Sequence, residues 1–104
     1  MMRADIAWLA GLLEGEGSFA VCKPKVKGRH YPYPTIRLRM TDEEPVRQAA
    51  VLLGSACGRL KDLPSGKPLY QTASTASKAA GWMMTLYNLL SPRRRHQIRK
   101  ALIA

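Results

Sequence analysis

The chain has 104 residues, which allows one domain with a modest core but not two. Its hydrophobic content of 46% excludes a disordered tail. Its 17 Lys and Arg against 7 Asp and Glu leave a net charge of +10, which favours a polyanionic partner, most often a nucleic acid.

A membrane surface is the rival partner for so basic a chain. No apolar run approaches the roughly 20 residues that a membrane span needs, and no basic segment carries a clean apolar stripe, so we expect no membrane contact. The two cysteines, Cys22 and Cys57, lie far apart and have no C-x-x-C or His spacing for zinc. We therefore expect an intracellular, reduced location: the cytoplasm or nucleoid of a bacterium or phage-infected cell, or an organelle.

The chain begins with a predicted helix and strand. Asp5 is expected to cap a helix over 5–14, which Gly15 can end. The segment 18–23 is predicted to be a strand, and the segment 23–34, which proline and glycine punctuate, is predicted to be a loop.

A second strand is predicted over 35–41, where the sequence TIRLRMT alternates strictly. Its three apolar side chains fall on one face, and Arg37 and Arg39 fall on the other. We therefore expect a half-buried strand with a cationic open face.

The second half of the chain is predicted to repeat helix, strand and strand, and to close with two helices. Asp42 caps a helix over 42–54 that has acidic residues in its first turn, and Gly54 ends it. The further elements are strands at 58–63 and 68–75, a turn at 64–67, and helices at 77–91 and 93–104. The order α-β-β-α-β-β-α-α predicts an α+β fold, a single domain over 1–104 with an antiparallel four-stranded sheet and helices on one face.

The other face of such a sheet is open, and period 2 predicts which side chains it carries. They are Ser18, Ala20, Cys22, Tyr33, Thr35, Arg37, Arg39, Arg59, Lys61, Gln71 and Ala73. Side chains of this kind can read base edges in a major groove, where Arg suits guanine and Gln suits adenine. The alternative is a solvated face whose Arg and Lys only keep an open sheet soluble.

The segment LAGLLEGEG at 9–17 places two glutamates among three glycines in this basic chain. It resembles the LAGLIDADG motif of the homing endonuclease family. The first four residues match, Leu13 replaces Ile, and Glu-Gly-Glu-Gly stands for Asp-Ala-Asp-Gly. The family's half-domain has the same element order, so the resemblance covers nearly the whole chain and implies a saddle-like open sheet face for DNA.

One edge of the predicted first helix consists mainly of small residues, which would let a second helix approach backbone to backbone. Its residues lie at i, i+3, i+4 and i+7: Ala7, Ala10, Gly11 and Glu14. Because the chain carries one motif and not two, the resemblance implies a homodimer built on these paired helices.

Glu16 is expected just past the end of this helix, near the dimer axis and the open sheet face. The resemblance implies that the Glu16 carboxylates of two chains bind Mg²⁺ against a scissile phosphate, with Mn²⁺ or Ca²⁺ able to substitute in binding. Two such acids would be costly to place together without a cation. The alternative is an exposed helix end with ordinary solvated glutamates.

Asp42 stands where the family places a polar residue, often Gln, that orders water near the metals. Here it is an acid, which could serve as a general base or only as the cap of its helix. Arg47, on the second predicted helix, is a candidate for the same cleft. Lys78, at the start of the third, is expected to contact a backbone phosphate.

The family also has a basic residue before the final helix that approaches the scissile phosphate. Aligning on Gln97 selects Arg94 for this role, with Arg93 and Arg95 one step away on either side. The alternative for the cluster is a non-specific phosphate clamp, which would still serve DNA binding.

Taken together, the resemblance implies a site-specific endonuclease that cuts double-stranded DNA as a homodimer, at a long palindromic or near-palindromic site, without a small-molecule cofactor. Family members are encoded with introns or inteins. The alternative is a nucleic-acid-binding protein of the same fold without cleavage, such as an intron maturase or a transcriptional regulator. The carboxylate at Glu16 favours the nuclease, because negative charge beside phosphates weakens binding unless a cation intervenes.

Overall fold

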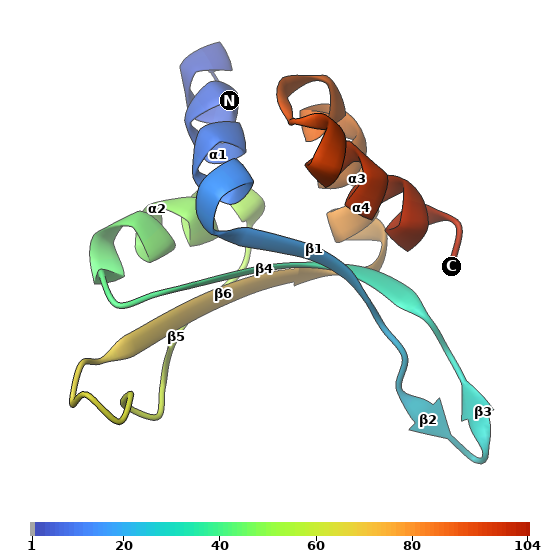
Figure 1. Ribbon diagram of the computed structural model, residues 1–104, viewed down its shortest axis with the longest axis horizontal. Coiled ribbons are helices and arrows are strands. Elements are labelled where there is room, and N and C mark those ends of the chain that lie inside the picture. Colours follow the sequence, from blue (N-terminus) through green and yellow to red (C-terminus); the bar gives the residue numbers. More distant parts are fainter. Residues whose placement is uncertain (1) are drawn as a thin grey trace.

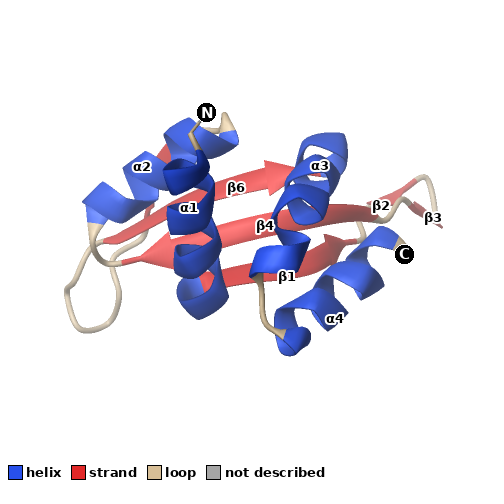
Figure 2. Cartoon of the chain, turned by 90° about the horizontal axis from the view of Figure 1, so that it is seen from above, coloured by secondary structure: helices blue, strands red, loops and turns tan. Residues whose placement is uncertain are grey.

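The computed structural model describes residues 2–104 and has two layers, helices above one face of a bent antiparallel sheet (Figures 1 and 2). The helices are α1 (Arg3–Glu16), α2 (Glu43–Leu53), α3 (Ala76–Leu86) and α4 (Pro92–Leu102), with the short 3-10 helix η1 (Tyr87–Leu89) before α4. The sheet strands, in spatial order, are β1 (Gly17–Cys22), β4 (Tyr33–Met40), β6 (Leu69–Thr75) and β5 (Cys57–Leu60). The predicted α+β fold and element order are confirmed.

The segment predicted to be a loop, 23–34, contains a separate two-stranded hairpin, so that prediction was wrong. Strands β2 (Lys25–Val26) and β3 (Arg29–His30) pair across a two-residue turn. Lys27 and Gly28 both have positive φ in that turn, 50° and 80°, as a tight hairpin with right-handed strand twist requires.

The ends of α1 differ from the prediction. Met2 is its N-cap, and Asp5 lies one turn inside, where its carboxylate accepts a 3.4 Å hydrogen bond from the Met2 amide. The helix runs through Gly15 and ends only at Glu16, with Gly17 as its C-cap. A Cβ at Gly17 would lie 2.7 Å from Cδ2 and 2.8 Å from the carbonyl oxygen of Leu13, so the close turn into β1 needs glycine there.

The ends of α2 agree with the prediction. Asp42 is its N-cap, and its side chain accepts a 3.4 Å hydrogen bond from the Glu44 amide. Gly54 is the C-cap with φ 69°, in the left-handed region that glycine adopts without strain.

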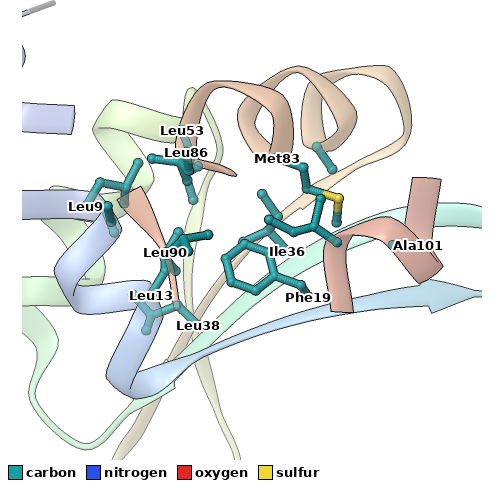
Figure 3. Packing of buried hydrophobic residues seen from close by; sticks show 14 of the residues in the cluster. Leu9, Leu13, Phe19, Ile36, Leu38, Leu53, Met83, Leu86, Leu90 and Ala101 are labelled. Atoms are coloured by element: carbon teal, nitrogen blue, oxygen red, sulfur yellow. The ribbon is translucent and has the colours of Figure 1, made fainter. Parts of the chain in front are cut away.

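The hydrophobic core lies between the helices and the upper face of the sheet (Figure 3). Leu9 and Leu13 of α1 and Ile36 and Leu38 of β4 are fully buried in it, and Phe19 of β1 is 5% exposed. Burial of such side chains stabilises each by about 1.5–3 kcal/mol, so the core holds the end of α1 firmly against β1 and β4. None of the helices formed by residues 2–104 combines the length and apolar character that a membrane crossing needs.

Candidate functional site

The sheet is bent like an arch, and its concave face points away from the helices (Figure 1). The β2–β3 hairpin hangs from one end of the arch, and the connection between β5 and β6 hangs from the other. The register places these predicted residues on the concave face: Ser18, Ala20, Cys22, Tyr33, Thr35, Arg37, Arg39, Gln71 and Ala73. Thr35 lies on this face by register but is only 2% exposed. The contact of these concave-face residues with DNA stays a prediction.

Arg59 was predicted to lie on the concave face, and this prediction was wrong. It pairs with Tyr70, which pairs with Met40, and this row faces the helices. Its guanidinium binds Asp62 at 3.0 Å, and this hydrogen-bonded ion pair raises the pKa of Arg59 above its usual value. Lys61 lies beyond the end of β5, so alternation along the strand does not assign it to either face.

Glu16 lies at the edge of the concave face, in the last turn of α1 and not beyond it. It is exposed and lines a shallow pocket of about 270 Å³ together with Ser18, Arg37 and Arg39. The last turn of α1 contains no basic residue, and the C-terminal end of a helix carries partial negative charge. The Glu16 carboxylate and this helix end are therefore anionic, beside the cationic side chains of Arg37 and Arg39.

A single chain does not complete a metal site. Within residues 2–104, no group of three His, Cys, Asp or Glu side chains lies close enough together to hold a metal ion. Mg²⁺ needs about six oxygen ligands, of which it keeps several as water. The Glu16 carboxylate can therefore supply one ligand per chain, and the others have to come from water, a phosphate or a second chain.

Two pairs of concave-face side chains are held by cross-strand contacts. The Nε of Arg39, on β4, donates a 2.5 Å hydrogen bond to Oε1 of Gln71, on β6. At the far end of β4, a hydrogen bond with Cys22 raises the pKa of Tyr33, so its phenol stays protonated near neutral pH. Arg37 lies between these two contacts and is exposed.

Arg94 is buried inside the chain and cannot reach a phosphate, so its predicted role was wrong. It is only 7% exposed. Its Nε donates to the backbone carbonyl of Glu14 at 3.0 Å, its Nη1 donates to Oε1 of Gln97 at 3.0 Å, and its guanidinium lies 5.9 Å from the Phe19 ring centroid. Burial, with the nearby charge of Arg93, lowers the pKa of Arg94. Arg94 therefore ties the end of α1 to α4.

Arg95 is also occupied by the chain itself. Its guanidinium donates to the backbone carbonyls of Tyr87 at 3.2 Å and Asn88 at 3.4 Å, and so it caps η1. Arg93 is exposed, and no hydrogen bond or ion pair binds its side chain within the described part of the chain. Of the three consecutive arginines, Arg93 is the one available to a phosphate.

Glu14 has a structural partner that the sequence did not reveal. Its carboxylate accepts hydrogen bonds from the Ser91 amide at 2.6 Å and from the Ser91 hydroxyl at 2.9 Å. These bonds, chiefly the one from the backbone amide, lower the pKa of Glu14 below its usual value. Ser91 is the N-cap of α4, so Glu14 fastens the start of α4 to the last turn of α1.

The small-residue edge of α1 differs from the predicted one. Ala10 is 2% exposed and belongs to the core, and Glu14 is bound to Ser91. The residues of α1 that do form an exposed small-residue stripe are Ala4, Ala7, Gly11 and Gly15. A Cβ at either glycine would meet nothing within 4 Å, so this side of the helix is open.

Arg47 and Lys78 lie on helices above the sheet and not on its concave face (Figure 2). The predicted place of Arg47 in the cleft was therefore wrong, whereas the contact of Lys78 with a backbone phosphate stays a prediction. The guanidinium of Arg47 binds Glu43 at 2.6 Å, one turn away on α2. The ammonium of Lys78 donates to the Gly54 carbonyl at 2.5 Å and ties α3 to α2. The catalytic role of Asp42 stays a prediction, because its observed role is the helix cap alone.

No protein-family model and no curated protein sequence matches the chain. Solved structures do match. The homing endonuclease I-CvuI in complex with the I-CreI target in the presence of magnesium has a TM-score of 0.70 at 14% identity, over 93% of this chain and 62% of that one. The archaeal intron-encoded homing endonuclease I-Vdi141I complexed with DNA has a TM-score of 0.70 at 17% identity, over 93% and 65%. The LAGLIDADG meganuclease I-CpaMI bound to uncleaved DNA has a TM-score of 0.65 at 17% identity, over 93% and 36%.

These matches extend over almost all of this chain but over less than two thirds of each of these three proteins. They show that the chain has the fold of LAGLIDADG homing endonucleases, and they confirm the structural resemblance that the motif at 9–17 predicted.

Proposed function

We propose that this chain is a metal-dependent, site-specific DNA endonuclease that acts as a homodimer on a long palindromic or near-palindromic site. The observation that carries the proposal is the position of Glu16, an acid at the edge of a concave cationic sheet face. The proteins of similar fold are homing endonucleases bound to DNA, one of them in the presence of magnesium. A carboxylate beside the expected path of phosphates weakens DNA binding unless a cation lies between them. In metal-dependent cleavage such a cation takes part in the reaction.

A second copy of the chain would complete the site. The exposed stripe with Ala7 and Gly11 lets a second α1 approach closely, and α1 ends at Glu16. Such pairing of helices would bring two carboxylates to one axis, where each would hold a cation. A bound Mg²⁺ lowers the pKa of water and stabilises a leaving oxygen.

The remaining side chains would contact DNA or hold Glu16 in place. Arg37, Arg39 and Ser18 line the pocket with Glu16 and would contact the DNA groove on either side of the cut. Arg93, not Arg94, would contact a backbone phosphate. The buried Arg94 would instead keep the last turn of α1, and therefore Glu16, in place.

The second candidate is a nucleic-acid-binding protein of this fold that does not cleave, such as an intron maturase or a regulator. The burial of Arg94 favours it, because the basic residue expected beside the scissile phosphate is absent from the concave face. This candidate predicts tight binding with no cleavage under any metal.

The test is cleavage of a randomised duplex library with Mg²⁺, compared with EDTA. Glu16→Gln should abolish cleavage and keep or raise DNA affinity, because it removes a metal ligand and a repulsive charge together. Glu44→Gln is the matched control, since Glu44 is an exposed acid on α2 and should change neither property. Full cleavage by Glu16→Gln would overturn the mechanism. Binding by the wild type without cleavage in Mg²⁺ or Mn²⁺ would favour the second candidate.

A further inference from the structure

Arg39 and Gln71 are joined by a side-chain hydrogen bond that links β4 to β6 across the concave face. They are directly paired across the two inner strands, β4 and β6. Gly58 continues the row on β5, and a Cβ there would meet nothing within 4 Å. The pair therefore lies on the two inner strands, one residue before the end of β4, with open space beside Gln71.

The chemistry of arginine decides which way the Gln71 amide points. A guanidinium has donors and no acceptor, so the 2.5 Å contact with Nε requires the amide oxygen of Gln71 to face Arg39. Reading adenine with both atoms of the amide group needs that same oxygen free, to accept from the adenine amino group. In this arrangement Gln71 cannot be the adenine reader that its residue type predicts.

The groups that the pair leaves free are all donors. They are the two terminal nitrogens of the Arg39 guanidinium and the amide nitrogen of Gln71. In a major groove, guanine presents two acceptors, N7 and O6, whereas adenine and cytosine present amino groups. An amino group facing these donors would leave polar groups unpaired, so the pair disfavours adenine and cytosine. Thymine presents one acceptor, O4, where guanine presents two, so guanine pairs with the most donors.

We infer that Arg39 and Gln71 act as one donor-only unit that specifies guanine, with Gln71 orienting Arg39. The inference rests on the proposed function and names the base that this part of the site requires. Arg39 also lines the pocket that contains Glu16, so the guanine belongs to the inner part of each half-site, next to the cleavage position. Phosphate oxygens are acceptors as well, and the experiment separates them from guanine.

The experiment is selection of bound duplexes from a randomised library, with Ca²⁺ present, for the wild type and for variants. The wild type should prefer guanine at one inner position of each half-site, by roughly 5- to 150-fold over adenine. Arg39→Ala should abolish that preference. Gln71→Ala should weaken it, and should have no further effect at that position when Arg39 is already alanine. Gln71→Glu keeps the acceptor for Arg39 but replaces the free amide donor with an acceptor, so it should keep a reduced guanine preference and lower overall affinity.

Gln48→Ala is the matched control, because Gln48 is an exposed glutamine on α2 and should leave the preference unchanged. A thermal midpoint for each variant confirms that it is folded. An adenine preference that depends on Gln71 and not on Arg39 would overturn the inference, and so would uniform losses of affinity with no change in base preference, which indicate phosphate contact. If the wild type cleaves a specific site without an inner guanine, only this inference fails. If it binds no duplex DNA, the proposed function fails with it.

Discussion

Replacement of Arg94 tests whether this arginine stabilises the fold around the site or contacts DNA. Arg94→Met keeps the length and apolar stem of the side chain but removes two hydrogen bonds, to the Glu14 carbonyl and to Gln97. The Glu14 carbonyl is one of the last four of α1, which have no partner within the helix. Loss of a charged donor at a site only 7% exposed leaves this carbonyl unsatisfied.

We expect Arg94→Met to lower the free energy of unfolding by about 3 kcal/mol, from two charge-assisted hydrogen bonds at about 1.5 kcal/mol each. For a domain of this size that corresponds to a fall of roughly 10–20 °C in the thermal midpoint. Urea unfolding followed by circular dichroism measures it. Arg94→Lys should lose less, because it keeps the charge but not the forked geometry.

Arg93→Met is the matched control, since Arg93 is exposed on the first turn of the same helix. It should change stability by no more than about 0.5 kcal/mol. It should, however, reduce the slope of log affinity for DNA against log salt by about 0.9 per chain, the value of one phosphate contact. Arg94→Met should leave that slope unchanged at a temperature where it is folded. The reasoning is refuted if Arg94→Met keeps its stability and loses a phosphate contact.

Two further predictions concern α1. The lowered pKa of Glu14 contributes stability that is present above its usual value of 4.5 and is lost as the pH falls through the lower folded pKa. Glu14→Gln should therefore flatten the pH dependence of urea unfolding below about pH 5. An unchanged pH profile would contradict this account. Gly11→Leu should leave the fold of the single chain intact or up to about 1 kcal/mol more stable, because its side chain points into open space, yet should abolish the dimer in light scattering at micromolar concentration. A dimer that survives this change does not use the exposed stripe of α1, and a wild type that is monomeric removes the shared-site proposal.

Local patterns in the sequence were enough for most of the fold. The strict alternation of 35–41 predicts β4 and the face on which Arg37 and Arg39 lie, because neighbouring side chains in a strand point to opposite sides whatever the strand packs against. Asp42 and Gly54 predict the ends of α2, because capping depends on the backbone and side chains of a few adjacent residues. The nine residues of the motif at 9–17 predict the fold of homing endonucleases, which the structural matches confirm.

The parts of the site that the sequence could not predict depend on contacts between distant segments. Alternation in 58–63 is compatible with either face, and only the pairing of Arg59 with Tyr70 shows that this arginine faces the helices. Three consecutive arginines have the same local pattern, and only the packing of α4 against Phe19 and the end of α1 makes Arg94 the buried one. Periodicity determines which residues share a face, but the docking of one element on another decides which face is covered, because the energy of burial belongs to the pair and not to either segment.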